Sequence, residues 1–284
     1  MRIRAVSLLC FSLLVISATF VPAQMPSLPA CNGFRWIVNA GSLRASQAAF
    51  SLDLQRHYFD SACTFLVQGR NAPADYRDWH AVRTHSAPSL DALQRAAADA
   101  SAGALLYDPE AWEMTPPEEQ HHPAAAACRA ASIAHAQGRI LIVTPAIDLM
   151  RILAPGAARG GRRFEAFAQT GIAGRIARCA DVYEIQAQGA ERDTAKFRKF
   201  VTTEAKQARA ANPRILVLAG ISTNPTGQRV TPQELFDAVR SVRGVVDGFW
   251  LNIPAGGRYC PTCGAPQPQV AVESLKMMAA DRPW

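Results

Sequence analysis

Several common catalytic and binding motifs are missing from this sequence of 284 residues. The glycine-rich stretch at 156–161 lacks the spacing and the lysine of a phosphate-binding loop, and neither a dinucleotide-binding fingerprint nor a serine-based catalytic motif is present. No basic run is interleaved with aromatic residues, so nucleic acid is not an expected partner. The six histidines are not spaced as zinc ligands. We therefore expect neither a metal nor another cofactor.

Long apolar runs are confined to the N-terminus. Two arginines precede an apolar stretch at 5–20, and Val21 and Ala23 stand at the positions of a cleavage site, which predicts a secretory signal peptide over residues 1–23. The alternative is an uncleaved N-terminal anchor. The stretch is shorter than the roughly 20 residues of a membrane-spanning helix, and no later segment is long enough to span. We expect a secreted or periplasmic monomer with one domain over 24–284 and no membrane span.

Six cysteines remain once the signal peptide is removed, and an even number in an exported protein predicts disulfides. Sequence alone does not choose among their pairings. Cys260 and Cys263 form a Cys-x-x-Cys motif in a loop rich in proline and glycine, where we expect them to form a disulfide that staples the loop. The alternatives for this pair are a thiol-redox site and half of a metal site.

The order of apolar and helix-like segments predicts the fold. Apolar runs at 104–108, 139–145, 181–188, 214–222 and 247–254 alternate with helix-like segments, which indicates strands that pair in parallel through helical crossovers. Further strand candidates at 34–40, 62–68 and 80–85 make eight, with helical candidates at 45–57 and 89–100. Removal of 23 residues from 284 leaves 261, close to the roughly 250 of a (β/α)₈ barrel.

We therefore predict an α/β protein with a (β/α)₈ TIM-type barrel. A distortion is expected in its first third, because residues 69–79 leave little room for a helix. The alternative is a doubly wound open sheet.

Two helix starts have the same signature. Thr115, Pro116 and Glu118 repeat as Thr231, Pro232 and Glu234. In such a start the threonine caps the helix, proline occupies the first helical position, and the glutamate reaches back to the cap amide. We therefore leave Glu118 and Glu234 out of the catalytic candidates.

Polar side chains follow the predicted strands, where the functional loops of a barrel lie. Carboxylates and carboxamides predominate among them, which favours a polar, sugar-like ligand. The candidate catalytic residues are Asp108, Glu110 and Glu184, and the candidate substrate-binding residues are Trp112, Asp148, Gln186, Asn224, Trp250 and Asn252. Arginines at 159, 162 and 163 lie in a glycine-rich loop, where we expect solvated side chains.

The alternation of the strand at 181–188 places Glu184 with Gln186 and Gln188 on one face, opposite Tyr183 and Ile185. In a barrel one face of each strand points inward, and the polar set is expected there. A buried carboxylate must be hydrogen-bonded or have an altered pKa, and either state suits acid–base catalysis. The alternative is a structural polar layer. By the same parity, Trp250 and Asn252 point inward, so Trp250 either floors a sugar-binding pocket or fills the core.

This arrangement resembles that of chitinase-type glycoside hydrolases. The resemblance lies in Asp108 and Glu110 at the end of the fourth strand, in the polar sixth strand, and in Trp250 near the end of the eighth. It implies that Asp108 orients the substrate, that Glu110 is the proton donor, and that Trp250 lies under the reacting sugar. The sequence departs from the family pattern at Leu106, where the family has another aspartate, and at Pro109, which could instead end the strand and turn Glu110 outward.

The leading hypothesis is an exported barrel that cleaves a glycosidic bond in a polysaccharide or oligosaccharide by carboxylate chemistry. Glu110 and Glu184 could face each other as acid and nucleophile or as acid and base, depending on whether about 5 Å or more than about 6.5 Å separates them. A carbohydrate-binding or scaffold barrel without catalysis is the second hypothesis. A thiol-redox or metal protein that uses Cys260 and Cys263 is the third.

Overall fold

The computed structural model describes residues 27–68, 73–159, 162–258 and 260–281. Eight strands form a closed barrel in chain order, and each strand is parallel to its neighbours. The strands are β1 (Arg35–Asn39), β2 (Thr64–Val67), β3 (Val82–Ala87), β4 (Ala104–Tyr107), β5 (Ile140–Val143), β6 (Val182–Ile185), β7 (Leu216–Ser222) and β8 (Gly248–Asn252). The predicted (β/α)₈ barrel is therefore confirmed, and the open sheet is excluded.

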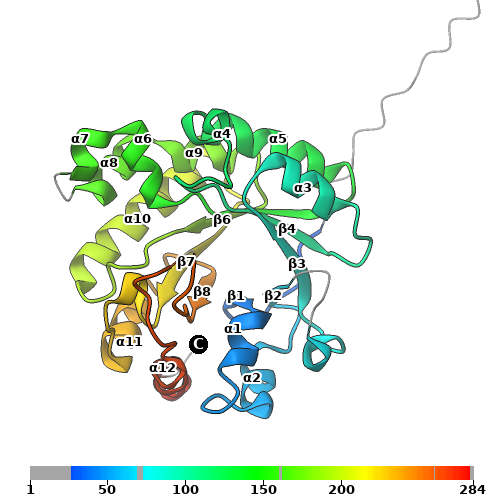
Figure 1. The fold of residues 1–284 in the computed structure, drawn as a ribbon, viewed down its shortest axis with the longest axis vertical. Coiled ribbons are helices and arrows are strands. Elements are labelled where there is room, and N and C mark those ends of the chain that lie inside the picture. The colour runs from blue at the N-terminus through cyan, green and yellow to red at the C-terminus, as the bar shows by residue number, and fades with distance from the viewer. Residues whose placement is uncertain (1–26, 69–72, 160–161, 259, 282–284) are drawn as a thin grey trace, which may run out of the picture.

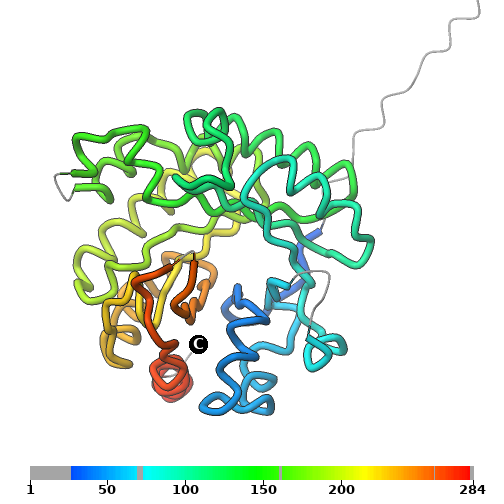
Figure 2. The backbone as a smooth tube through the Cα atoms, viewed as in Figure 1, coloured from blue at the N-terminus to red at the C-terminus, as the bar shows by residue number. Residues whose placement is uncertain are grey.

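Helices surround the strands, with α3 to α9 along one side and α1, α2, α11 and α12 toward the other (Figures 1 and 2). They are α1 (Ala40–Ala45), α2 (Leu52–Phe59), α3 (Leu90–Ala97), α4 (Pro117–His121), α5 (Pro123–His135), α6 (Met150–Leu153), α7 (Pro155–Arg159), α8 (Arg163–Gln169), α9 (Ile172–Ala177), α10 (Thr194–Ala211), α11 (Pro232–Ser241) and α12 (Pro268–Ala280). Among these described helices, none has the length and apolar character needed to cross a membrane. The predicted signal peptide at 1–23 lies outside the described residues.

The first third has the expected irregularity. Between β2 and β3 the described residues contain only a 3₁₀ turn, η1 (Ala74–Tyr76), in place of an α-helix. The single helix predicted at 45–57 was wrong, because Ser51 begins a new helix: its hydroxyl accepts a hydrogen bond from the amide of Leu54. The segment at 164–179, between β5 and β6, likewise forms two helices, since Gly171 adopts a left-handed conformation (φ 63°) between α8 and α9.

The barrel has an inner and an outer apolar core. Val182 packs inside the barrel with residues such as Leu106 and Leu218, whereas Tyr183 and Ile185 pack outside, between strands and helices. Since side chains alternate along a strand, Glu184 shares the inward face with Val182. The predicted inward orientation of Glu184 and of Trp250 is confirmed.

Three disulfides resolve the pairing that the sequence left open. Cys31 pairs with Cys63, Cys128 with Cys179, and Cys260 with Cys263. The first ties the chain before β1 to the start of β2, and the second ties α5 to the end of α9. Cys260 and Cys263 are bonded to each other as predicted, and the described residues contain no cluster of His, Cys, Asp and Glu suited to a metal. In this state the two sulfurs are paired with each other, whereas the thiol and metal hypothesis required unpaired sulfurs or further ligands.

Only one of the two predicted helix caps is present. Thr231 and Glu234 form a capping box at the start of α11, with the Thr231 amide donating to the glutamate at 2.8 Å. The prediction for Thr115 and Glu118 was wrong, because α4 begins at Pro117 and no side chain caps it. The Thr115 hydroxyl instead donates to the carbonyl of Pro88 and is used by the loop after β4.

Candidate active site

Asp108 follows β4 directly and is held by side chains from the next two strands. The Thr144 hydroxyl after β5 donates to its Oδ1 at 2.7 Å, and Gln186 Nε2 after β6 donates to the same oxygen at 3.0 Å. Gln186 also donates to the carbonyl of Thr144. Burial raises the pKa of Asp108 to about 6, and the charge of Asp148 adds to this, while the Thr144 and Gln186 bonds oppose it. Asp108 therefore has a fixed orientation and titrates near neutral pH.

Glu110 lies two residues further on, and Pro109 does not turn it away from the barrel. The Pro109 carbonyl accepts a hydrogen bond from the amide of Ala146, and the Glu110 amide donates to Thr115 Oγ1 at 3.2 Å. These two bonds fix the backbone at Pro109 and Glu110. Burial raises the pKa of the Glu110 carboxyl to about 8, and the charges of Asp108 and Asp148 raise it further against the opposing effect of Arg151. Glu110 is consequently protonated at neutral pH.

The same loop positions a tryptophan and a third carboxylate. Trp112 Nε1 donates to Thr115 Oγ1 at 2.9 Å, and the amide of Ala111 donates to Asp148 Oδ1 at 3.0 Å. Thr115 thus holds both Glu110 and Trp112. Asp148 lies in the 3₁₀ turn η2 (Ile147–Leu149) after β5 and is partly exposed.

An open cavity of about 520 Å³ lies at the barrel mouth and brings most of the predicted site residues together. Besides residues of the surrounding loops, it is lined by Asp108, Glu110, Trp112, Asp148, Gln186, Gln188, Ser222, Trp250 and Asn252. The carboxyl ends of the strands converge here, as expected for a barrel of this type. Seven of the nine predicted residues, all except Glu184 and Asn224, therefore share one cavity.

Glu184 lies deeper in the barrel than the cavity and is fully buried. Neither of its carboxyl oxygens has a hydrogen-bond partner among the described residues. Burial raises the pKa of Glu184 well above its ordinary value, and the charge of Asp108 adds to this. The side chain occupies space left by Gly220, where a Cβ would come within 2.5 Å of Glu184 Oε1. Glu184 therefore does not line the mouth cavity with Glu110, and we do not include it in the proposed catalytic pair.

Asn224 is buried and has a different set of partners. Its Nδ2 donates to the carbonyls of Cys263 at 2.8 Å and Ala265 at 3.4 Å. It therefore secures the loop after β8, whose Cys260 and Cys263 line the mouth cavity.

The sequence reasoning missed several residues that shape the mouth. Glu191 is buried and accepts hydrogen bonds from the amides of Ser222 at 2.8 Å and Gly189 at 2.6 Å, so it joins the loops after β6 and β7. No spacing in the sequence indicated this role. Arg163, expected to be solvated, is half-buried and lines the cavity together with Arg151. The only sequence signal was the cluster of arginines near 160.

The chain matches no protein-family model and no curated protein sequence. Among solved structures it is similar to the carboxyl transferase domain of a pyruvate carboxylase variant from Rhizobium etli with pyruvate, at 10% identity and a TM-score of 0.45 over 92% of this chain and 54% of that chain. It is also similar to triosephosphate isomerase from Bartonella henselae, at 13% identity and a TM-score of 0.36 over 77% of this chain and 92% of that chain. The chain spans about half the length of the first. Neither similarity bears on activity.

Proposed function

We propose that the protein is an exported glycoside hydrolase and that the mouth cavity is its active site. The observation that carries this proposal is the pair of carboxyl groups in one cavity, with the pKa of Asp108 near 6 and that of Glu110 near 8. Glycoside hydrolysis generally requires two carboxyl groups, one protonated and one ionised at neutral pH, and the surroundings of each group set its protonation state.

Glu110 acts as the general acid. As the glycosidic C–O bond breaks, its proton moves to the oxygen of the leaving sugar; a water molecule then bonds to the anomeric carbon through its oxygen and gives one proton back to the Glu110 carboxylate, which restores the acid. Asp108 is ionised over much of the neutral range and stabilises the positive charge that develops on the sugar ring. The hydrogen bonds from Thr144 and Gln186 keep its carboxylate in place for this role.

The tryptophans of the cavity support a carbohydrate as the substrate. Trp250 and Trp112 both line it, and an aromatic face packs well against the C–H face of a sugar ring. Export is proposed from the N-terminal sequence, and three disulfides are in keeping with an oxidising compartment.

The test is cleavage of a panel of oligosaccharides, followed by the appearance of new reducing ends. We expect the wild-type protein to cleave at least one glycan class and the Glu110→Gln variant to lose this activity while it still binds the substrate. Glu118→Gln is the matched control, because Glu118 is exposed on α4 and does not line the cavity. Binding of a glycan by the wild-type protein without cleavage would instead favour a carbohydrate-binding barrel.

A further inference from the structure

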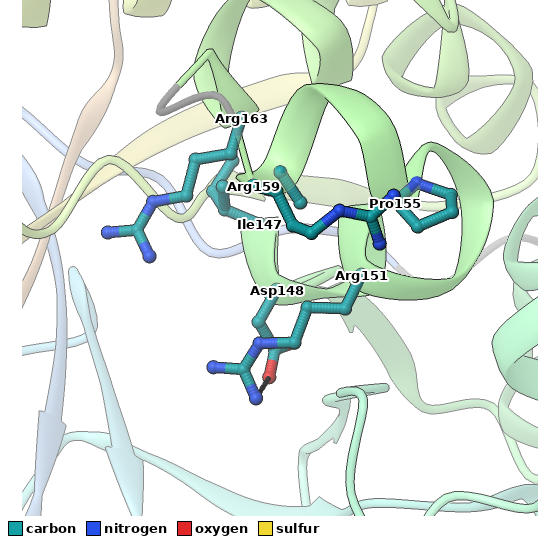
Figure 3. Close-up of a pocket in the computed structure, with 7 residues that line it drawn as sticks. Ile147, Asp148, Arg151, Pro155, Arg159 and Arg163 are labelled. Atoms are coloured by element: carbon teal, nitrogen blue, oxygen red, sulfur yellow. Dashed lines mark ion pairs between the residues drawn. The ribbon is translucent and has the colours of Figure 1, made fainter.

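A second hollow of about 330 Å³ adjoins the mouth cavity, and three arginines surround it. Arg151, Arg159 and Arg163 line it together with Asp148, the one acid in this group, and in Figure 3 Arg151 lies beside Asp148. Asp148, Arg151 and Arg163 also line the mouth cavity. A ligand that occupies the mouth can therefore extend into the hollow.

The positive charge of this hollow is poorly compensated. Asp148 is 3.9 Å from Arg151 through Oδ2, while its Oδ1 accepts the amide of Ala111. Within the described parts of the chain, Arg159 has no acidic partner. In the view of Figure 3, only Arg151 is joined to an acid by a dashed line. The lining of the hollow thus holds three guanidinium groups and one carboxylate, which gives the hollow itself a net positive charge.

Arg163 is held where a ligand could reach it. Its guanidinium lies 5.4 Å from the Phe164 ring, and a Cβ at Gly189 would be 3.7 Å from its Nη2. The contact with Phe164 orients the guanidinium without neutralising its charge. Since Arg163 lines both the hollow and the mouth cavity, it lies where the two meet.

We propose that this hollow is a subsite for an anionic group, a carboxylate or a sulfate, on an acidic oligosaccharide whose neighbouring sugar occupies the mouth cavity. The planar guanidinium fork matches both groups through two parallel hydrogen bonds. The inference rests on the proposed function for the sugar part of the ligand, whereas recognition of the anion rests on the arginines alone.

The test is a binding titration with the Glu110→Gln variant, in which cleavage does not interfere. The probes are an oligogalacturonate, which carries carboxylates, a sulfated oligosaccharide, and a neutral oligosaccharide of equal length. We expect one acidic probe to bind at least about tenfold more tightly than the neutral one. This difference in affinity should decrease as the salt concentration rises. The acidic probe with the higher affinity identifies the anionic group.

Arg163→Ala, added to Glu110→Gln, should weaken binding of the acidic probe about tenfold and binding of the neutral probe much less, since it removes a charge-assisted hydrogen bond that only the anionic group makes. The affinity of Arg163→Lys for the acidic probe should lie between those of the Arg163 protein and the alanine variant, because lysine keeps the positive charge but lacks the planar guanidinium that forms two parallel hydrogen bonds. Arg162→Ala is the control, as Arg162 is exposed and lines neither cavity. Equal binding of acidic and neutral probes, or equal losses for the two alanine variants, overturns the subsite.

The two proposals fail separately. If the wild-type protein cleaves none of the glycans while acidic probes still bind through Arg163, the proposed hydrolase falls and the anion subsite stands. If neutral glycans are cleaved and the acidic probes bind no more tightly than the neutral one, the anion subsite is refuted and the proposed hydrolase activity is retained.

Discussion

Replacing Glu110 by glutamine should stabilise the protein, and the gain should grow with pH. The pKa of this carboxyl is about 8 in the folded protein, against an ordinary value of 4.5. Between these values the folded state binds more protons than the unfolded state, so the stability of the wild-type protein falls as the pH rises through this window. Glutamine does not titrate and has nearly the same shape, so the variant escapes this loss.

The size of the effect follows from the displacement of the pKa. A difference of about 3.5 pKa units corresponds to at most about 5 kcal/mol. Glu110 is partly exposed and its charge is screened by solvent, so we expect about 2 kcal/mol. This gain should be near zero at pH 4 and reach its full value above pH 8.

Urea unfolding of wild-type and variant protein at several pH values between 4 and 9 measures this difference directly. Glu118→Gln serves as the control and should follow the wild-type curve, because Glu118 is exposed. If the stabilities of wild-type and Glu110→Gln protein run parallel across this range, Glu110 has an ordinary pKa and the argument for it as the acid fails.

Two further predictions concern activity and the paired threonines. The rate of cleavage should be highest between about pH 6 and 8, because Asp108 gains a proton below this range and Glu110 loses its proton above it; a flat profile of kcat/KM would contradict these roles. Thr231→Ala should cost about 1 kcal/mol in urea unfolding and leave activity unchanged, since it removes only a helix cap. Thr115→Ala should reduce activity, because it removes the acceptor that holds Glu110 and Trp112; equal activity in the two variants would refute this contrast.

Much of the barrel was predictable because its signals are local and repeat along the chain. Apolar runs at regular intervals predicted the eight parallel strands, and the parity of one strand correctly placed Glu184 inside. The alternation of side chains along a strand does not indicate how deep in the barrel an inward side chain lies. Whether an inward side chain lines the cavity or lies below it depends on the side chains of neighbouring strands. Here Gly220 has no side chain, and the space this leaves accommodates the buried Glu184 carboxyl.

Identical local signals also had different outcomes. Thr115 and Thr231 begin the same motif, yet only Thr231 caps a helix, because the Thr115 hydroxyl meets Pro88 and the loop after β4. The pairing of Cys31 with Cys63 and of Cys128 with Cys179, and the placement of Arg163, depend on contacts between segments far apart in sequence. No spacing along the chain records such contacts, which is why they were not predicted.

The most direct test of the proposed activity is hydrolysis in water enriched in ¹⁸O, with the products analysed by mass spectrometry. The account predicts that wild-type protein releases a sugar with ¹⁸O at its new anomeric hydroxyl, and that Glu110→Gln releases none above background. If wild-type protein releases no labelled sugar from any glycan of the panel, or if Glu110→Gln releases it at the wild-type rate, the mouth cavity is not the site of glycoside hydrolysis that we propose.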